Sequence, residues 1–155
     1  MQTIDPDLAL IVLHAAATWF MTGLIWFVQV VHYPLKAAVG RGTFTTYQAQ
    51  HVQRTGWVVG PPMIVEALTA AALVVLPSAR VDEGAALVGL CLLVLVWAST
   101  ALFSVPAHGR LAGGFDPGAH QRLVRTNWIR TVGWSARSGV ACWLLLFGLQ
   151  RGALA

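Results

Sequence analysis

Polar residues recur at helical spacing inside a segment that is otherwise apolar enough to cross a membrane. Asn127, Arg130, Trp134 and Arg137 follow steps of three, four and three residues, so in a helix all four project from one face. An arginine near the bilayer centre costs about 2.5–3.5 kcal/mol on insertion scales, and such groups face the bundle interior and are paired. The stripe therefore predicts a buried polar site.

Glu66 is the acidic residue that the apolar segments offer as a partner for Arg137. It lies about nine residues inside its helix and Arg137 about ten inside its own, so both reach a similar depth if the two helices start from the same side. We expect the two side chains to form an ion pair. Such a pair either only fixes helix packing or lines a cavity for a substrate or a proton path, and the sequence leaves both readings open.

Chemistry on a flat ring needs groups that stabilise negative charge, groups that move a proton and surfaces that hold the ring. Arg130 and Arg137 suit a developing phenolate or enolate, and we expect Arg130 to donate to carbonyls of the nearby connection or to a bound anion. Glu66 or His108 suits proton transfer. The predicted ring-binding residues lie on or near the inner helix faces or at the cytoplasmic mouth: Trp26, Trp97, Asn127, Trp134 and His51.

The first and third apolar stretches carry polar stripes of their own. Their members recur at helical spacing: His14, Thr18, Thr22, Gln29 and His32 in the first, and Trp97, Thr100 or Ala101, Ser104 and His108 in the third. Small hydroxyl residues in membrane helices often serve only to join neighbouring helices. Four stripes that converge on one bundle predict a polar interior open towards the cytoplasm.

Histidine is the residue type through which a cofactor would be held. His32, His51, His108 and His120 are predicted at the cytoplasmic end, with His14 nearer the outer face. A bis-histidine haem needs two histidines at compatible depths, so His14 suits only a single axial ligand. No HxxH, HExxH or ExxH spacing supports a metal site, and none is predicted. The sequence does not identify the cofactor, and haem is one alternative. The histidines could also act as neutral imidazoles that donate or accept a proton.

Composition indicates the class of protein that must position these residues. Hydrophobic residues make up 57% of the 155 and charged residues 10%, whereas soluble domains have roughly 45–50% and about 25%. Apolar stretches near residues 8–31, 57–76, 85–105 and 127–149 are each long enough to span a bilayer, which needs about 20 residues. We predict an all-α integral membrane four-helix bundle, up-down-up-down, forming a single transmembrane domain over residues 1–155.

Basic residues gather in or beside the first and third connections: Lys36, Arg41, Arg54, Arg110, Arg122 and Arg125. Under the positive-inside rule these connections are cytoplasmic, so both termini are predicted on the outer side of the cell membrane, which in a bacterium is the inner membrane. Because membrane topology accounts for where the basic residues lie, the net charge of +4 is no argument for nucleic-acid binding. No nucleic-acid partner is predicted.

The two cytoplasmic connections differ in pattern. In the first, Phe44, Tyr47 and His51 recur at three- and four-residue spacing, which predicts a helix lying along the membrane interface. The third, PAHGRLAGGFDPGAH, is rich in Gly and Pro and predicts a shaped loop. The outer connection, PSARVDEG, is short and predicts a hairpin of the second and third helices.

SVPAHGRL and HQRLVRTNWIRTVGWSAR, at residues 104–111 and 120–137, resemble the closing part of small four-helix membrane proteins of the anthrone-oxygenase-like family. In that family a Pro, polar residue, Leu element precedes an Asn, Arg, Thr element that opens the last helix. The matching residues here are Pro106, His108 and Leu111, then Asn127, Arg130 and Thr131. His108 stands where an asparagine-like residue is expected. The resemblance implies an oxygenase-like activity.

LHAAATWFMTG, at residues 13–23, resembles the opening of haem-associated four-helix membrane proteins related to protoporphyrinogen oxidases. That resemblance implies that His14 is a haem ligand. The group is expected to have a lysine in its third helix, whereas the one lysine of this chain is Lys36. The haem interpretation therefore ranks second.

These patterns together predict a membrane oxidoreductase or oxygenase-like enzyme that acts on a hydrophobic aromatic or quinone-like substrate in a polar cavity open to the cytoplasmic side. One alternative is a haem- or quinone-binding membrane protein. Another is a non-catalytic accessory subunit of a larger membrane complex. The expected partners are the lipid bilayer and a hydrophobic small molecule, with a homo-oligomer or a larger membrane complex as the further assembly.

Overall fold

The computed structural model describes residues 5–76 and 78–154, and the regular structure within them is helical throughout. The first elements are α1 (Pro6–Phe27), the π-helical turn η1 (Val28–His32), α2 (Tyr33–Leu35), the 3-10 turn η2 (Lys36–Ala38) and α3 (Phe44–Val75). They are followed by α4 (Glu83–Ser99), the π-helical turn η3 (Thr100–Ser104), α5 (Val105–Leu111) and α6 (Pro117–Ala153). Pro77 of the predicted outer connection and the ends of the predicted domain, residues 1–4 and 155, lie outside the described residues.

Within the described residues these elements form four helical rods, each long and apolar enough to cross a membrane: Pro6–Ala38, Phe44–Val75, Glu83–Leu111 and Pro117–Ala153. The all-helical prediction is confirmed. The rods extend beyond the predicted spans, because helix continues past the apolar stretches. The 37 residues of α6 measure about 55 Å at about 1.5 Å per residue, more than the hydrocarbon thickness of about 30 Å.

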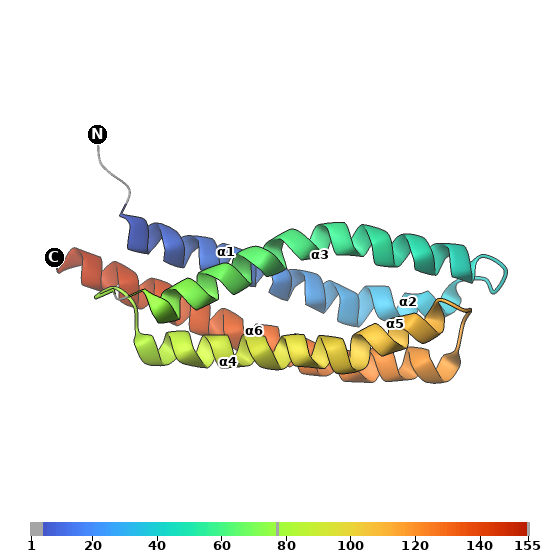
Figure 1. The fold of residues 1–155 in the computed structure, drawn as a ribbon. Coiled ribbons are helices and arrows are strands. Elements are labelled where there is room, and N and C mark those ends of the chain that lie inside the picture. The colour runs from blue at the N-terminus through green and yellow to red at the C-terminus, as the bar shows by residue number, and fades with distance from the viewer. Residues whose placement is uncertain (1–4, 77, 155) are drawn as a thin grey trace.

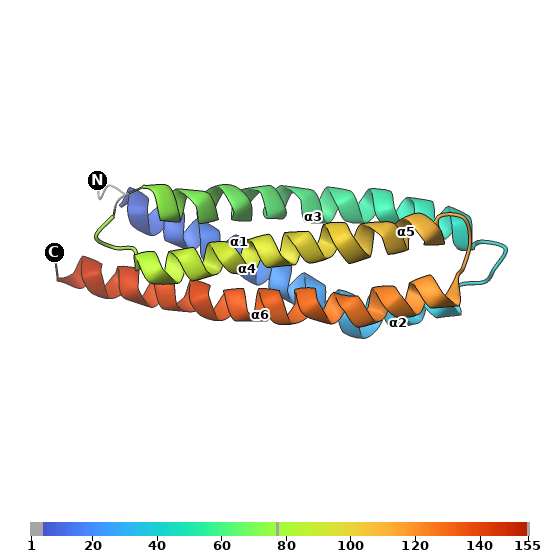
Figure 2. The same cartoon turned by 60° about the horizontal axis from the view of Figure 1, so that its bottom comes forward.

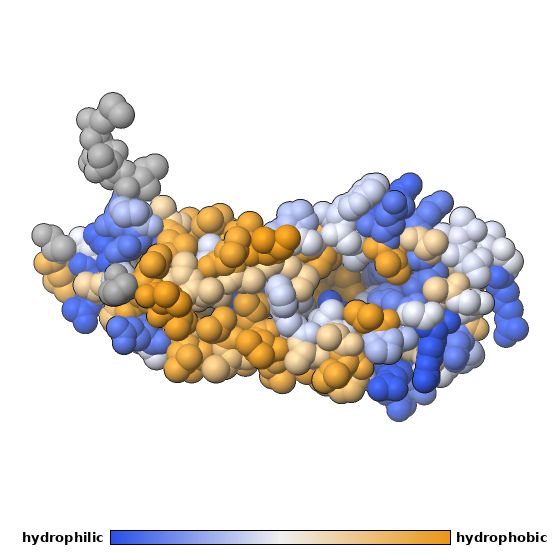
Figure 3. All heavy atoms as spheres, in the orientation of Figure 1, coloured by the Kyte–Doolittle hydropathy of each residue, from blue (hydrophilic) through white to orange (hydrophobic). Residues whose placement is uncertain are grey.

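Consecutive rods lie side by side and run back and forth between two ends of the molecule (Figures 1 and 2). One end, here called the terminal end, holds the start of α1, the end of α6 and the described residues between α3 and α4. The other, here called the loop end, holds residues 39–43 and 112–116. On the face that Figure 3 shows, a broad apolar belt lies between the two ends, and hydrophilic residues gather most densely at the loop end.

Aspartates fix where three of the rods begin. Asp5, Asp82 and Asp116 each accept hydrogen bonds from backbone N–H groups of the first turn that follows them, which satisfies donors that a helix start leaves free. Asp82 also accepts from the Trp143 indole of α6 at 2.9 Å. That bond, and then the one from the Ala85 N–H, hold the pKa of the Asp82 carboxyl below its ordinary value.

A proline follows each π-helical turn. Pro34 comes after η1 and Pro106 after η3, each as the second residue of the next helical segment. Proline lacks an N–H, and its ring clashes with the carbonyl four residues earlier, so a wider turn before it keeps the rod continuous. The two turns lie on the rods that flank the site described below.

Two predictions for the connections need correction. Phe44, Tyr47 and His51 are helical, but they belong to the first turns of α3 and continue into the span without a break. Most of the third connection is helical too, because Pro106 lies at the start of α5 and Pro117 at the start of α6, positions where proline favours a helix. Only residues 112–116 form the turn in which the chain reverses direction between α5 and α6. Gly114 enables this turn with a φ of 137°.

Gly133 allows α4 and α6 to approach closely. A Cβ atom at this position would lie 2.5 Å from Cγ2 of Val96, which is fully buried. We predict that Gly133→Ala lowers the free energy of unfolding by about 1–3 kcal/mol, because added volume in a packed interior forces its neighbours to shift. The measurement is unfolding of the purified protein in detergent, followed by circular dichroism.

Gly139→Ala is the matched control on the same helix, since a Cβ at Gly139 meets nothing within 4 Å. Its helix propensity should leave stability unchanged or slightly raised. Equal losses from the two substitutions would contradict the close approach at Gly133.

Candidate functional site

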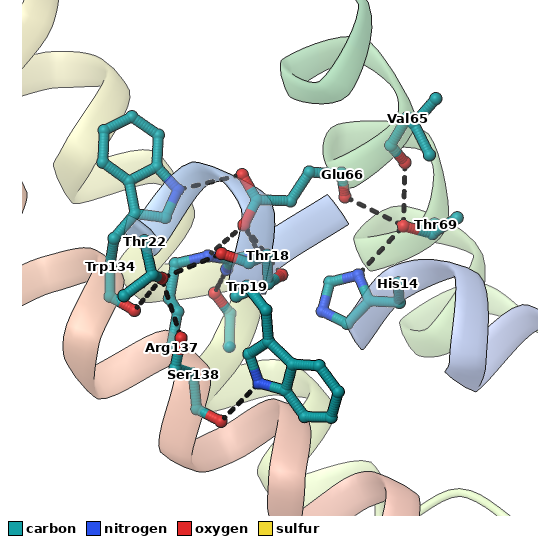
Figure 4. Close-up of polar contacts among 11 residues, drawn as sticks. His14, Thr18, Trp19, Thr22, Val65, Glu66, Thr69, Trp134, Arg137 and Ser138 are labelled. Atoms are coloured by element: carbon teal, nitrogen blue, oxygen red, sulfur yellow. Dashed lines mark hydrogen bonds and ion pairs between the residues drawn. The ribbon is translucent and has the colours of Figure 1, made fainter. Parts of the chain in front are cut away.

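Glu66 and Arg137 form a buried ion pair, which confirms the pairing predicted from the sequence. Arg137 Nη2 lies 2.9 Å from Glu66 Oε1, and Arg137 Nε donates to the same oxygen at 3.0 Å. The two side chains are 0% and 1% exposed, respectively. Figure 4 shows Glu66 reaching from α3 towards α6. The charges of the predicted stripe therefore do face the interior.

The pair joins all four rods. Thr18 of α1 donates to Glu66 Oε1 at 2.8 Å, and the indole N–H of Trp134 donates to Oε2 at 3.1 Å. Arg137 Nη1 donates to the carbonyl oxygen of Gly89 in α4. The carboxylate is thus satisfied by three side chains, as a charge in a low-dielectric interior requires.

Hydroxyl groups around the pair join helices, as predicted for Thr18 and Thr22. The Thr22 hydroxyl lies 2.7 Å from that of Ser138 and 3.0 Å from the Trp134 carbonyl oxygen, which links α1 to α6 (Figure 4). Ser104 is buried as well and accepts from Arg130. These contacts are of the kind that small hydroxyl residues make between membrane helices.

His14, the predicted haem ligand, lies beside the ion pair at 4% exposure. Its Nδ1 is 2.9 Å from the Thr69 hydroxyl, which itself donates to the Val65 carbonyl at 2.8 Å (Figure 4). The Thr69 oxygen therefore accepts from His14, so the His14 proton lies on Nδ1. His14 takes no part in lining the cavity described next.

A cavity of about 640 Å³ lies between α1, α3 and the η3–α5 segment, on the loop-end side of the ion pair. Figure 3 shows the surface hollowed between α3 and α5. Apolar side chains such as Met21, Ile25 and Val52 form most of its wall. Its volume lies within the range of roughly 300–1,000 Å³ that small-molecule sites occupy. Polar groups enter the wall from several helices: Tyr33, Gln48, His51, Ser104, His108 and Arg130.

Arg130 reaches this wall from α6 and is 9% exposed. Its Nη1 donates to the Ser104 hydroxyl and to Asn127 Oδ1, both at 3.1 Å. These contacts replace the predicted ones to carbonyls of the third connection, which is mostly helical. Asn127 in turn donates to Gln29 Oε1 at 2.8 Å. Asn127 is fully buried behind Arg130, so it positions the guanidinium rather than lining the cavity.

The predicted gathering of histidines at one end of the bundle is confirmed. His51 Nδ1 lies 3.0 Å from His32 Nε2, and the His51 and His108 ring centroids are 5.4 Å apart. His120 contacts the Tyr33 carbonyl oxygen at 2.8 Å. In the part of the chain that the structure describes, no group of three His, Cys, Asp or Glu side chains is placed to hold a metal ion.

A chain of hydrogen bonds that the sequence analysis missed runs from a buried lysine to the cavity. Lys36 Nζ donates to Gln48 Oε1 at 2.8 Å, and both side chains are fully buried. Gln48 Nε2 is 3.0 Å from His108 Nδ1, and His108 Nε2 is 3.1 Å from the Tyr33 hydroxyl. One signal existed, because steps of four and three residues from Gln29 through Tyr33 to Lys36 extend the stripe of the first helix.

The prediction that Trp26 and Trp97 lie on inner faces is wrong. They are 43% and 41% exposed. Each directly follows a buried residue, Ile25 or Val96, and successive helix residues differ by about 100° in direction, so neither side chain faces the interior. The Trp26 indole lies at the bundle surface, where it donates to the Ser135 hydroxyl of α6 at 3.0 Å. Trp134 is fully buried, as predicted, with the Arg130 guanidinium 5.6 Å from its ring centroid. It thus contacts both the ion pair and the cavity residue Arg130.

Comparison with known proteins adds no relative: the chain matches no protein-family model, no curated protein and no solved structure. The arguments about function therefore rest on the geometry of the site.

We predict that Glu66→Gln lowers the free energy of unfolding by about 3–5 kcal/mol, because it leaves the Arg137 guanidinium buried without a counter-charge. It also brings amide hydrogens to a position where Thr18, Trp134 and Arg137 all donate. Replacing Arg137 with Met in the same protein should recover much of the loss, since the double variant has no charge left at this position. Unfolding in detergent is measured for Glu66→Gln, for Arg137→Met alone and for the double variant.

Glu83→Gln is the control for loss of a negative charge, because Glu83 is exposed in the first turn of α4. Its effect should be within about 1 kcal/mol. A loss in the double variant equal to the sum of the single losses would show that Glu66 and Arg137 do not interact energetically.

Proposed function

We propose that this protein is a membrane oxidoreductase or oxygenase-like enzyme whose substrate is a hydrophobic aromatic or quinone-like molecule bound in the cavity. The observation that carries the proposal is the cavity itself. Its wall is mainly apolar, and the guanidinium of Arg130, two imidazoles and a phenol lie on it. An apolar pocket with a few convergent polar groups is the usual form of a small-molecule site.

The roles of the residues follow from where they lie. Arg130 would stabilise negative charge on a ring oxygen, and His51, or His108 through the Tyr33 hydroxyl, would take or return the proton. In the oxygenase-like case dioxygen would accept the electrons. Glu66 and Arg137 lie outside the cavity wall and hold the bundle together. We therefore assign them the role of a structural clamp.

The proposal includes an orientation. The rods would cross the cell membrane as an up-down-up-down bundle, with the loop end in the cytoplasm and the termini on the outer side. The basic connections at the loop end support this orientation. The first turns of α3 would then pass through the cytoplasmic interface, and the cavity would lie where the apolar belt gives way to hydrophilic surface (Figure 3).

A quinone-binding protein without catalysis is the second candidate, because the same cavity suits a quinone ring. The two are separated by turnover: an enzyme consumes dioxygen or changes the spectrum of its ligand, whereas a carrier only binds it. The haem alternative is decided by the visible absorption spectrum of the purified protein. An accessory subunit of a larger membrane complex would bind neither haem nor a ring compound.

We predict that Val52→Phe weakens binding of menadione and of anthrone about tenfold or more, because the added ring occupies the cavity. Binding is measured by quenching of tryptophan fluorescence in nanodiscs, with empty nanodiscs as the blank. Val58→Phe is the matched control: Val52 and Val58 lie on α3 and are each 50% exposed, but only Val52 lines the cavity. Wild-type affinity in both variants would show that the cavity is not the site.

The orientation predicts a labelling pattern. In a background with Cys91 and Cys142 replaced by Ala, Gly113→Cys at the loop end should react with a membrane-impermeant maleimide only after the cells are permeabilised. A cysteine added after Ala155 should react in intact cells. The reverse pattern would overturn the orientation and leave the fold untouched.

A further inference from the structure

The buried Lys36 fixes the orientation of Gln48. Lys36 is fully buried, and its Nζ lies 2.8 Å from Gln48 Oε1 and 5.7 Å from the ring centroids of both Tyr33 and Tyr47. A protonated amine only donates, so it faces the carbonyl oxygen of the amide. The Gln48 NH2 group must then point the other way, towards His108.

The orientation of Gln48 determines which nitrogen of His108 carries the proton. Gln48 Nε2 lies 3.0 Å from His108 Nδ1 and 3.4 Å from the His108 carbonyl oxygen, so its two hydrogens have two acceptors. An NH2 group cannot accept, so Nδ1 carries no proton and the neutral ring is protonated at Nε2. That N–H donates to the Tyr33 hydroxyl oxygen at 3.1 Å. Tyr33 therefore keeps its own hydrogen for another partner.

We infer that the Tyr33 hydroxyl, held as a free donor by the Lys36–Gln48–His108 chain, binds a carbonyl or phenolate oxygen of the cavity ligand together with Arg130. This inference rests on the proposed function and deepens it, because it specifies the ligand chemistry. Tyr33 and Arg130 both line the cavity, and both offer hydrogens. Arg130 Nε is buried without a hydrogen-bond partner.

The charge of the wall favours the same class of ligand. Among the described residues that line the cavity there is no Asp or Glu, whereas Arg130 carries a positive charge. A ligand that offers an acceptor oxygen satisfies these donors, but a cationic ligand would leave them unmet and meet like charge. Lys36 and Gln48 act through His108 without touching the ligand, so they are positioning residues.

The ligand is tested with two probes of one ring skeleton, menadione and 2-methylnaphthalene, of which only the first has carbonyl groups. In nanodiscs, Tyr33→Phe should weaken menadione binding about three- to tenfold, the range expected for one hydrogen bond, and leave 2-methylnaphthalene binding unchanged. Infrared spectra of carbonyl-labelled menadione should show a lowered C=O frequency in the wild-type complex and less lowering in Tyr33→Phe. Equal menadione affinity and frequency in both proteins would overturn the role of Tyr33.

The positioning chain is tested without any ligand. In protein with 15N-labelled histidine, the His108 signal, identified by its absence in His108→Gln, should show the Nε2-protonated tautomer. Lys36→Met, which keeps the buried volume, should shift His108 towards the Nδ1-protonated tautomer and lower menadione affinity. Arg41→Met removes a charge from an exposed site at the same end and should change neither. An Nδ1-protonated ring in the wild type would overturn the chain.

Failure of the proposed cavity function and failure of the inferred ligand chemistry give different results. If neither probe binds the wild type, the proposed cavity function fails, and the inferred ligand fails with it. If both probes bind with equal affinity, the cavity function stands and the acceptor oxygen is refuted.

Discussion

An isolated charge is costly inside an apolar bundle, and the Glu66–Arg137 contact pairs the two charges at the point where all four rods meet. Removing two ions from water costs several kcal/mol each, and their attraction offsets the cost only when the remaining hydrogen-bonding positions are filled as well. Here Thr18 and Trp134 donate to the carboxylate, and the Gly89 carbonyl accepts from the guanidinium. Because these groups come from all four rods, a shift of any one rod along its axis would leave a buried charge or donor unmet. Contacts between apolar side chains do not fix how far one rod is shifted along another, so the ion pair sets this alignment.

Trp134 extends this constraint to the cavity. Its indole N–H is fixed by Glu66, and its ring lies 5.6 Å from the guanidinium carbon of Arg130, which reaches the cavity wall. Arg130 is held from the other side by Ser104 and Asn127. Trp134 therefore links the ion pair to the cavity residue Arg130, whose guanidinium is positioned before any ligand arrives. Such preorganisation reduces the reorganisation required when charge develops on a bound oxygen.

The sequence predicted the positions of the buried charged side chains better than those of the tryptophans, for a physical reason. Glu66 and Arg137 could be paired because charges inside apolar segments have few alternatives. Trp26 and Trp97 could not be placed, because a membrane helix is apolar on every face and its periodicity does not separate lipid from interior. The position of Lys36 between two apolar stretches predicts a loop charge, whereas the side chain is a fully buried donor. The Gly and Pro content of the third connection predicts a loop, whereas its prolines begin helices. Which of these side chains are buried, and how far each rod extends, thus depend on tertiary contacts that cannot be inferred from one sequence.

The position of the cavity along the bundle limits what can use it. It lies beyond the ion pair, where the apolar belt meets the hydrophilic loop end, and the surface is hollowed there between α3 and α5 (Figure 3). A ring compound dissolved in the bilayer would reach such an opening sideways without crossing water, and its apolar part would meet Met21, Ile25 and Val52. Its oxygen would meet Tyr33 and Arg130, and neighbouring imidazoles could exchange protons with the aqueous side. Under the proposed function, the substrate would exchange electrons in hydrocarbon surroundings while its proton equilibrates with the aqueous side.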